Sequence, residues 1–417
     1  MKILIDSIFY DKESIGIAKY SGEMAGWLKN KGNRVSVITT HSHYPAWEIK
    51  GCNFYRIIRS KKLKILISPV FLPKKKKMTA LARLAYEGSY FFSSHPFYIF
   101  SYLKKPDILV SVYPSIFSLA NSVIFSKLSR TPLLVHVQDL QIDAASNLGF
   151  LRHDFVVEIL KRVEKILLSR ADAISTISDN MSKKIGDITG MHESIFLLPN
   201  WTDTSQISIK PRLNTLRHQM GYSQEDFVIL YSGNLGEKQG LEDLIKAAKI
   251  SEIDEDIKFI ICGSGGIKEK LIKLSLDAGL KNISFIELKP IEELSDLLAV
   301  ADLHIILQRR DAADIVMPSK LANCLASGRP TLVTAEIGTS LYDIITENDV
   351  GVTVDPEDPQ KISDKIFELK SNSLRRIEMS KNARKFAKLY LDKEAILQGF
   401  EEKLSEIVKS YRERGKR

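Results

Sequence analysis

The feature of this 417-residue chain that most constrains its fold is an alternation of β-type and helix-type segments that runs twice along the sequence. Residues 2–5 are apolar and β-prone, residues 17–31 carry apolar side chains at helical spacing, and residues 34–39 return to a β-type run. This order is typical of a parallel sheet covered by helices on both faces. The sequence therefore predicts an α/β protein.

The first round of the alternation covers residues 1–199. Further strands in this part are predicted at residues 108–112, 133–137, 173–176 and 195–198. We therefore expect an N-terminal Rossmann-like domain over residues 1–199. Turn-forming residues and a change to acidic composition follow it, so residues 200–212 are predicted to be a linker.

The second round begins after this linker. Its strands are predicted at residues 227–232, 257–262, 283–286, 303–307 and 331–334. Residues 213–390 should therefore form a second Rossmann-like, doubly wound domain. The charged residues 391–417 are expected to form a C-terminal helix that could cross back to the N-terminal domain.

The net charge of +9 is concentrated in one part of the chain. Residues 1–105 contain 19 Lys and Arg against 6 Asp and Glu, a net charge of +13. The positive charge is densest at Lys61, Lys62 and Lys64 and in the run Lys74 to Lys77. An aromatic stretch follows at residues 90–100. Such a combination suits an anionic membrane surface, and a solvated loop before a buried aromatic helix is the alternative. No nucleic-acid-binding motif accompanies the charge.

Cysteine usage and hydropathy point to the cytoplasm. The three cysteines, Cys52, Cys262 and Cys324, are far apart and suggest neither a disulfide framework nor a zinc site. The first apolar run is interrupted at Asp6, and no run of about 18 apolar residues follows. We expect a cytoplasmic protein that does not span a membrane.

A glycine-rich turn in the second lobe is the strongest candidate for a phosphate site. Gly233 and Asn234 follow the first strand of this lobe, and Lys238 follows before the next helix. Backbone amides of such a turn can surround a diphosphate while a lysine neutralises its charge. An ordinary turn with an exposed lysine is the alternative. Gly263 lies in a similar turn after the next strand, mainly as a tight turn beside the site.

A second candidate is the helix predicted after Pro318. Proline suits the first turn of a helix, and Ser319 and Lys320 would place amides and a cation at its positive end. Asn323 falls on the same face one turn later, and Gly328 ends the helix. The structural alternative makes Pro318 a cap and Asn323 a surface residue.

The first lobe offers three further candidates. Gly16 opens the first helix and would allow a ligand to approach the backbone closely. His136 and Asp139 stand at the carboxyl end of a predicted strand, where they could transfer a proton or hydrogen-bond a sugar hydroxyl. A buried structural histidine is the alternative for His136.

These elements, in this order, resemble glycosyltransferase family 4, a retaining family with the GT-B fold. The resemblance rests on residues 16–25, 136–139, 198–201 and 233–240 and on the Pro318-Ser319-Lys320 helix. It extends to the branch that makes colanic acid and transfers fucosamine. It implies two Rossmann-like domains facing across a cleft, of which the second binds the nucleotide sugar and the first receives the acceptor.

The sequence departs from the family pattern at three positions. Asn234 stands where the family usually has an arginine or lysine, so Lys238 is the only cation that the loop itself supplies. The two family glutamates would fall on Ile315 and Asn323. Asn323 could still bind ribose, whereas Ile315 cannot contact sugar hydroxyls as a carboxylate does, which suits a deoxy sugar.

The resemblance implies a metal-independent reaction without a cofactor. The donor would be a nucleotide sugar, with UDP preferred to GDP, and the acceptor a polyprenyl-diphosphate-linked saccharide at the inner leaflet. Lys238, the helix dipole and the amides near Ser319 and Lys320 would stabilise the leaving diphosphate. Two alternatives stay open, a catalytically silent nucleotide-sugar sensor and a sugar-nucleotide epimerase of the same fold.

Overall fold

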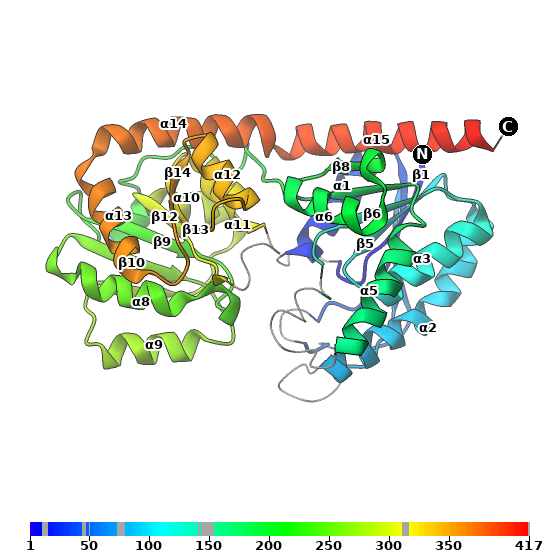
Figure 1. Cartoon of the computed structure of the whole chain (residues 1–417), viewed down its shortest axis with the longest axis horizontal. Coiled ribbons are helices and arrows are strands. Elements are labelled where there is room, and N and C mark those ends of the chain that lie inside the picture. The colour runs from blue at the N-terminus through cyan, green and yellow to red at the C-terminus, as the bar shows by residue number, and fades with distance from the viewer. Residues whose placement is uncertain are drawn as a thin grey trace. The chain divides into compact units, whose positions relative to one another are not determined.

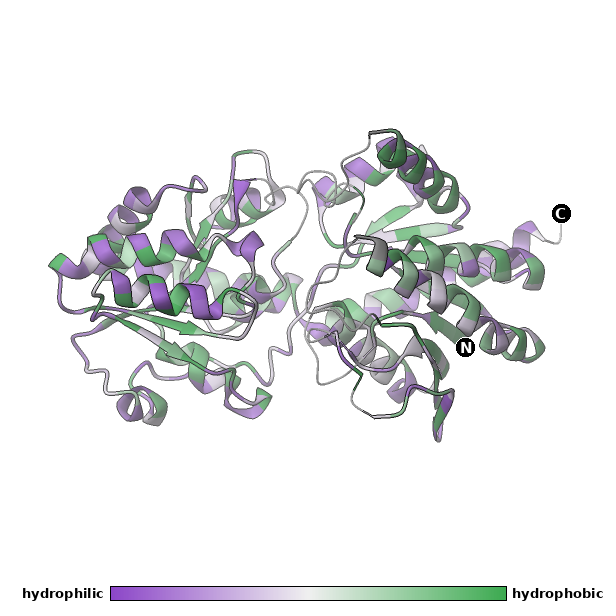
Figure 2. Ribbon diagram, turned by 90° about the horizontal axis from the view of Figure 1, so that it is seen from below, coloured by the Kyte–Doolittle hydropathy of each residue, from purple (hydrophilic) through white to green (hydrophobic). Residues whose placement is uncertain are grey.

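The chain folds into two compact α/β units. The computed structural model describes residues 1–10, 16–43, 47–49, 51–72, 80–140, 142, 154–310 and 317–415. One unit contains Met1–Pro199 together with Leu397–Arg417, and the other contains Asn200–Ile396. In each unit a sheet lies between layers of helices (Figure 1). Hydrophobic residues predominate in the strands, and hydrophilic residues are frequent on the helices of the C-terminal unit (Figure 2).

The N-terminal unit is built on one sheet. Its strands are β1 (Lys2–Asp6), β2 (Arg34–Thr40), β3 (Arg56–Ser60), β4 (Leu63–Ser68), β5 (Ile108–Tyr113), β6 (Leu133–Val137), β7 (Ala173–Thr176) and β8 (Ile195–Leu197). Its helices are α1 (Ile17–Asn30), α2 (Ala80–Lys104), α3 (Ile116–Ser129), α5 (Asp154–Leu168) and α6 (Asp179–Thr189). Among the described residues the strand order is β3-β4-β2-β1-β5-β6-β7-β8.

Strand β3 corrects the prediction of a wholly parallel sheet. It pairs with β4 in antiparallel register, Arg56 opposite Ile67 and Ser60 opposite Leu63, while the other described strands of this sheet are parallel. Every residue of β3 is exposed, whereas all six residues of β5 are buried. Exposed arginines on an edge strand oppose further pairing with other chains, which suits its position.

The C-terminal unit contains the second sheet. Its strands are β9 (Phe227–Ser232), β10 (Ile257–Cys262), β11 (Ile283–Ile286), β12 (Leu303–Ile306), β13 (Thr331–Thr334) and β14 (Gly351–Val354). Its helices are α7 (Thr215–Gln219), α8 (Leu241–Ile250), α9 (Lys268–Asp277), α10 (Leu294–Val300), α11 (Lys320–Ala326), α12 (Ser340–Glu347), α13 (Pro359–Ser371) and α14 (Ser373–Tyr390). The described strands are parallel in the order β11-β10-β9-β12-β13-β14.

This strand order creates a switch point between β9 and β12. The chain winds outward from β9 through β10 to β11, then returns to the other side of β9 to form β12. The loops that leave β9 and β12 therefore diverge to opposite sides of the sheet. Open α/β sheets bind ligands at this position, outside the carboxyl ends of the strands.

Helix α15 (Lys393–Arg414) ends the chain and packs on the N-terminal unit. Its buried residues are Leu397, Phe400, Leu404 and Val408, at the spacing of one helical face. Near its end, Arg412 forms an ion pair with Asp107 at 2.5 Å. Among the described residues, no helix is long and apolar enough to cross a membrane.

Candidate active site

The loop after β9, residues 233–240, lies at the switch point of the C-terminal sheet and is called the switch-point loop here. The glycine turn after β10, residues 263–266, holds it in place. The amide of Gly233 donates to the Cys262 carbonyl at 2.9 Å, and the amide of Leu235 donates to the Ser264 carbonyl at 2.9 Å. A Cβ atom on Gly263 would lie 2.0 Å from the Gly233 carbonyl oxygen. Gly263 therefore supports the loop by allowing two backbones to meet, and its predicted contact with the donor stays a prediction.

Lys320 places a cation directly on this loop. Its Nζ donates to the Tyr231 hydroxyl at 2.6 Å and lies 3.8 Å from the centre of the Tyr231 ring. The Tyr231 hydroxyl in turn donates to the Asn234 carbonyl at 2.6 Å. A Cβ on Gly233, whose φ is 149°, would lie 3.1 Å from Lys320 Nζ, so glycine makes room for the lysine.

The surroundings of Lys320 disfavour its charge. Burial of the ammonium lowers the pKa of Lys320 to about 7, although the residue keeps some accessible surface. The hydrogen bond and the ring contact to Tyr231 do not compensate for the loss of hydration, because Tyr231 carries no negative charge. Among the described residues no carboxylate forms an ion pair with Lys320. An anion beside Gly233 would restore the charged form.

Lys238 provides a second cation in the same loop. It lies in a short 3₁₀ helix, Glu237–Gln239, and its carbonyl accepts from the Arg309 amide at 3.1 Å. Its ammonium makes no hydrogen bond or ion pair with any described residue. Lys238 is thus available to a ligand, and its contact with the donor is still a prediction.

Arg309 is a candidate that the sequence analysis did not identify. It follows β12 at the switch point. A Cβ atom on Gly240, at the end of the switch-point loop, would lie 3.2 Å from Arg309 Cγ. The available signal was its position just after the predicted strand at residues 303–307. Residues 311–316, which include Ile315, lie outside the described part of the chain.

Helix α11 begins just after Pro318, where the sequence predicted a helix. Pro318 precedes the helix, Ser319 is its N-cap residue and Lys320 is its first residue. Asn323 lies one turn on, and its Oδ1 accepts from the Thr202 hydroxyl at 2.7 Å. The Asn323 amide nitrogen therefore stays available as a donor, whereas its oxygen already has a partner.

The structure surrounds His136 with protein. Its Nδ1 lies 3.0 Å from the Ser175 hydroxyl, its Nε2 lies 3.0 Å from Gln138 Nε2, and only 1% of the residue is exposed. Burial lowers the pKa of His136 to about 4, so the ring is neutral near pH 7. These contacts favour the alternative of a structural histidine. Its catalytic role stays a prediction, as does that of the half-buried Asp139.

Gly16 adopts a positive φ angle at the start of α1, a conformation that favours glycine. Its φ of 61° and ψ of −139° lie outside the region that other residues adopt readily, and α1 begins at the next residue. A Cβ there would meet no atom within 4 Å, so the conformation alone explains the glycine.

Asp6, at the carboxyl end of β1, is a buried carboxylate that the sequence analysis treated only as an interruption of an apolar run. It accepts hydrogen bonds from Tyr90 at 2.5 Å, from Ser122 at 3.2 Å and from Ser118. Burial raises the pKa of Asp6 despite these hydroxyl donors. Since its partners lie on α2 and α3, Asp6 ties both helices to the sheet.

Comparison with known proteins identifies the class of this fold. Residues 16–201 match the family model of the glycosyl transferase 4-like domain, and residues 214–386 match that of glycosyl transferases group 1. The structure resembles sucrose-phosphate synthase of Thermosynechococcus elongatus, with a TM-score of 0.78 and 14% identity over 98% of this chain and 99% of that one. The two units are therefore those of the GT-B fold, as the sequence predicted.

Relatives in sequence define the family. The chain is 35% identical to WcaI of Escherichia coli K12, named as a colanic acid biosynthesis glycosyl transferase, over 96% of this chain and 98% of WcaI. Anabaena HepE, solved in complex with UDP, has a TM-score of 0.72 and 17% identity over 97% of this chain and 100% of HepE. The chain belongs to the glycosyltransferase family in which a glycosyl transferase 4-like domain is followed by a glycosyl transferases group 1 domain. It is a glycosyltransferase.

Proposed function

We propose that this glycosyltransferase moves a sugar from a nucleoside diphosphate, UDP in preference to GDP, to a polyprenyl-diphosphate-linked saccharide in cell-surface polysaccharide synthesis. The likeness to WcaI, named for colanic acid biosynthesis, supports the pathway class. The fold shared with HepE, which binds UDP, supports the nucleotide. A deoxy or N-acetylated deoxy hexose fits the replacement of a family glutamate by Ile315.

Lys320 is the residue on which the donor assignment depends. It brings a cation to the switch-point loop, contacts Tyr231 and has no carboxylate partner among the described residues. Lys238 adds a second cation to the same loop. Two cations at a glycine-rich turn are suited to the two negative charges of a diphosphate, which they would orient and neutralise.

The same residues would stabilise the leaving group. When the bond from the anomeric carbon to the diphosphate oxygen breaks, its electron pair stays on that oxygen and adds one negative charge. Lys238 and Lys320 would stabilise this charge in place of a metal ion. The acceptor hydroxyl would form the new bond on the same face of the sugar, with retention through an oxocarbenium-like state, and its proton would pass to the departing diphosphate oxygen.

The N-terminal unit is where we place the membrane-associated acceptor. Three apolar residues of α2 project into solvent, Phe92 at 74%, Ile99 at 66% and Leu103 at 73% exposure, while Tyr90 and Phe97 are buried. Exposed apolar side chains beside lysines favour reversible attachment to an anionic surface. The aromatic stretch is thus only partly available to lipid, and Lys74 to Lys77 lie outside the described residues.

Product analysis tests this proposal. The purified protein should release UDP from a UDP-sugar only when a polyprenyl-diphosphate saccharide is present, and NMR of the product should show the anomeric configuration of the donor. Interconversion of sugars without acceptor would indicate an epimerase instead. Binding of every UDP-sugar tried without release of UDP under any acceptor condition would contradict transfer.

A further inference from the structure

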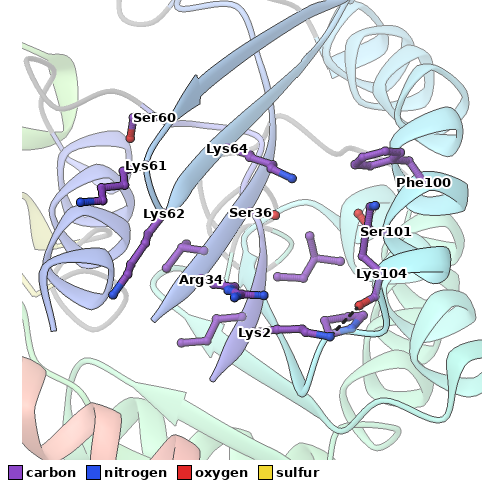
Figure 3. A pocket seen from close by; sticks show the side chains of 14 residues that line it. Lys2, Arg34, Ser36, Ser60, Lys61, Lys62, Lys64, Phe100, Ser101 and Lys104 are labelled. Carbon is purple, nitrogen blue, oxygen red and sulfur yellow. Dashed lines mark hydrogen bonds between the residues drawn. The ribbon is translucent and has the colours of Figure 1, made fainter. Parts of the chain in front are cut away.

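A basic cavity of about 450 Å³ lies at the edge of the N-terminal sheet where the parallel strands begin (Figure 3). Lys2 and Arg34 start β1 and β2, and Lys64 lies at the start of β4. Phe100 and Lys104 come from the last turns of α2. The cavity therefore lies at the amino ends of the parallel strands. Ligands of such sheets usually bind at the opposite side, outside the carboxyl ends.

Cations that have no counter-ion among the described residues dominate the lining of this cavity. They are Lys2, Arg34, Lys61, Lys62, Lys64 and Lys104, and the lining contains no carboxylate. None of the six forms an ion pair with a described residue. The nearby carboxylate of Asp107 already accepts from the Lys2 amide at 2.7 Å and from Arg412 at 2.5 Å.

Two of these ammonium groups converge on one aromatic ring. Lys64 Nζ lies 6.0 Å and Lys104 Nζ 5.4 Å from the centre of the Phe100 ring. The ring attracts each cation weakly, but it does not remove the repulsion between them. Figure 3 shows Arg34, Lys64 and Lys104 around the same opening, from three different elements.

Helix termination explains only part of this charge. Lysines near the last carbonyls of a helix are stabilised by its dipole, and Lys2 Nζ lies 3.4 Å from the Lys104 carbonyl at the end of α2. This role covers Lys2 and Lys104. It leaves Arg34, Lys64 and the exposed Lys61-Lys62 turn without a structural partner that would offset their mutual repulsion.

We propose that this cavity binds a phosphate-bearing anion, separately from the nucleotide-sugar site of the other unit. Its volume falls within the range of small-molecule sites, about 300 to 1,000 Å³, and several cations from different elements can contact one phosphate group. The phosphate can belong to a lipid head group or to a soluble compound. Ile99 and Leu103, exposed on α2 beside Phe100, favour the lipid. In that form the inference rests on the membrane association proposed above.

The test compares two triple variants that lose the same charge. The cavity variant is Arg34→Gln, Lys64→Gln, Lys104→Gln. The control is Lys381→Gln, Lys385→Gln, Lys388→Gln, three exposed lysines of α14 without ion pairs to described residues. Binding is measured to vesicles of equal parts phosphatidylglycerol and phosphatidylcholine, to pure phosphatidylcholine vesicles, and to inorganic pyrophosphate by calorimetry. Thermal unfolding checks that each variant folds, and Lys61→Gln, Lys62→Gln replaces the cavity variant if it does not.

If the ligand is a lipid, the partition coefficient of the cavity variant to the anionic vesicles should fall on the order of 100-fold, because each of the three charges contributes about 1 kcal/mol. The control should stay near the wild-type value. Loss of one pyrophosphate site in the cavity variant with unchanged or absent vesicle binding would support a soluble phosphate ligand and would exclude only lipid as the ligand of this cavity. Equal behaviour of cavity and control variants with both probes would overturn the proposal, whether or not the protein transfers sugar.

Discussion

Binding of a nucleoside diphosphate is expected to take up a proton at Lys320. In the free protein burial lowers the pKa of Lys320 to about 7. A diphosphate beside Gly233 would favour the charged ammonium and return the pKa toward the ordinary value of about 10.4. The protonated lysine would then donate to the ligand while keeping its position against Tyr231.

The sign and size of the effect follow from this difference in pKa. Above pH 7 the free protein loses the proton from Lys320 and the complex keeps it, so affinity falls as pH rises. With pKa values of about 7 free and about 10 bound, the dissociation constant at pH 9 should be about 50-fold that at pH 7. Without ligand, the unfolded chain holds more protons than the folded one between about pH 7 and 10.5, so this residue's contribution to stability rises across that window.

Calorimetry with UDP between pH 7 and pH 9 measures this dependence, because the terminal phosphate, with a pKa near about 6, is ionised throughout. Repeating the titration in buffers of different ionisation enthalpy counts the protons taken up. Lys320→Met should bind more weakly and lose the dependence on pH, whereas Lys238→Ala should bind more weakly and keep it. A flat profile for the wild type, or an unchanged slope in Lys320→Met, would refute a contact between Lys320 and the diphosphate.

Two further substitutions and one treatment test the same site. Lys238→Ala should weaken UDP binding by roughly 1.5–3 kcal/mol, because it removes a charge-assisted contact, and unchanged affinity in calorimetry would exclude Lys238 from the site. Gly263→Ala should lower both thermal stability and UDP affinity, since its Cβ would lie 2.0 Å from the Gly233 carbonyl oxygen, whereas Gly266→Ala meets no atom within 4 Å and serves as the matched control. Treatment with EDTA should leave transfer largely intact, and loss of turnover that magnesium or manganese restores would contradict a metal-free mechanism.

Strands with continuous apolar runs could be predicted to the residue. β9, β10 and β13 have the predicted bounds, because β-branched and aromatic residues fill each strand and turn residues or charges limit it. β14 was missed because it begins with Gly351, a residue that is depleted in strands. Its place depends on tertiary contact, since a Cβ on Gly351 would lie 1.9 Å from the Thr331 carbonyl oxygen.

The hairpin of β3 and β4 was missed for a different reason. Lysines at positions 61, 62 and 64 drew attention to charge, and the short runs on either side of them gave no clear alternation. The antiparallel register that pairs Ile58 with Ile65 exists only in the folded sheet. The same lysines that obscured the hairpin in the sequence line the basic cavity in the structure.

The candidate site shows a similar division between local and distant signals. The glycine turn and Lys238 are local features, and the sequence indicated both. The contact between Lys320 and Tyr231 joins residues 89 positions apart, so composition and spacing could not reveal it. The family pattern suggested that Lys238 was the loop's only cation, whereas the fold delivers a second one from α11.

Asn323 carries this reasoning one step further. Its Oδ1 accepts from Thr202, and the amide of Thr202 donates to the Leu391 carbonyl at 2.9 Å. One side chain of α11 is thus connected to the segment that enters the C-terminal unit and to the one that leaves it. A glutamate here would offer a ribose two acceptor oxygens, whereas Asn323 offers one oxygen, which already accepts from Thr202, and an amide donor. A ligand hydroxyl can therefore accept from the Asn323 amide or donate to the remaining lone pair of its oxygen, whereas a glutamate carboxylate at this position could only accept.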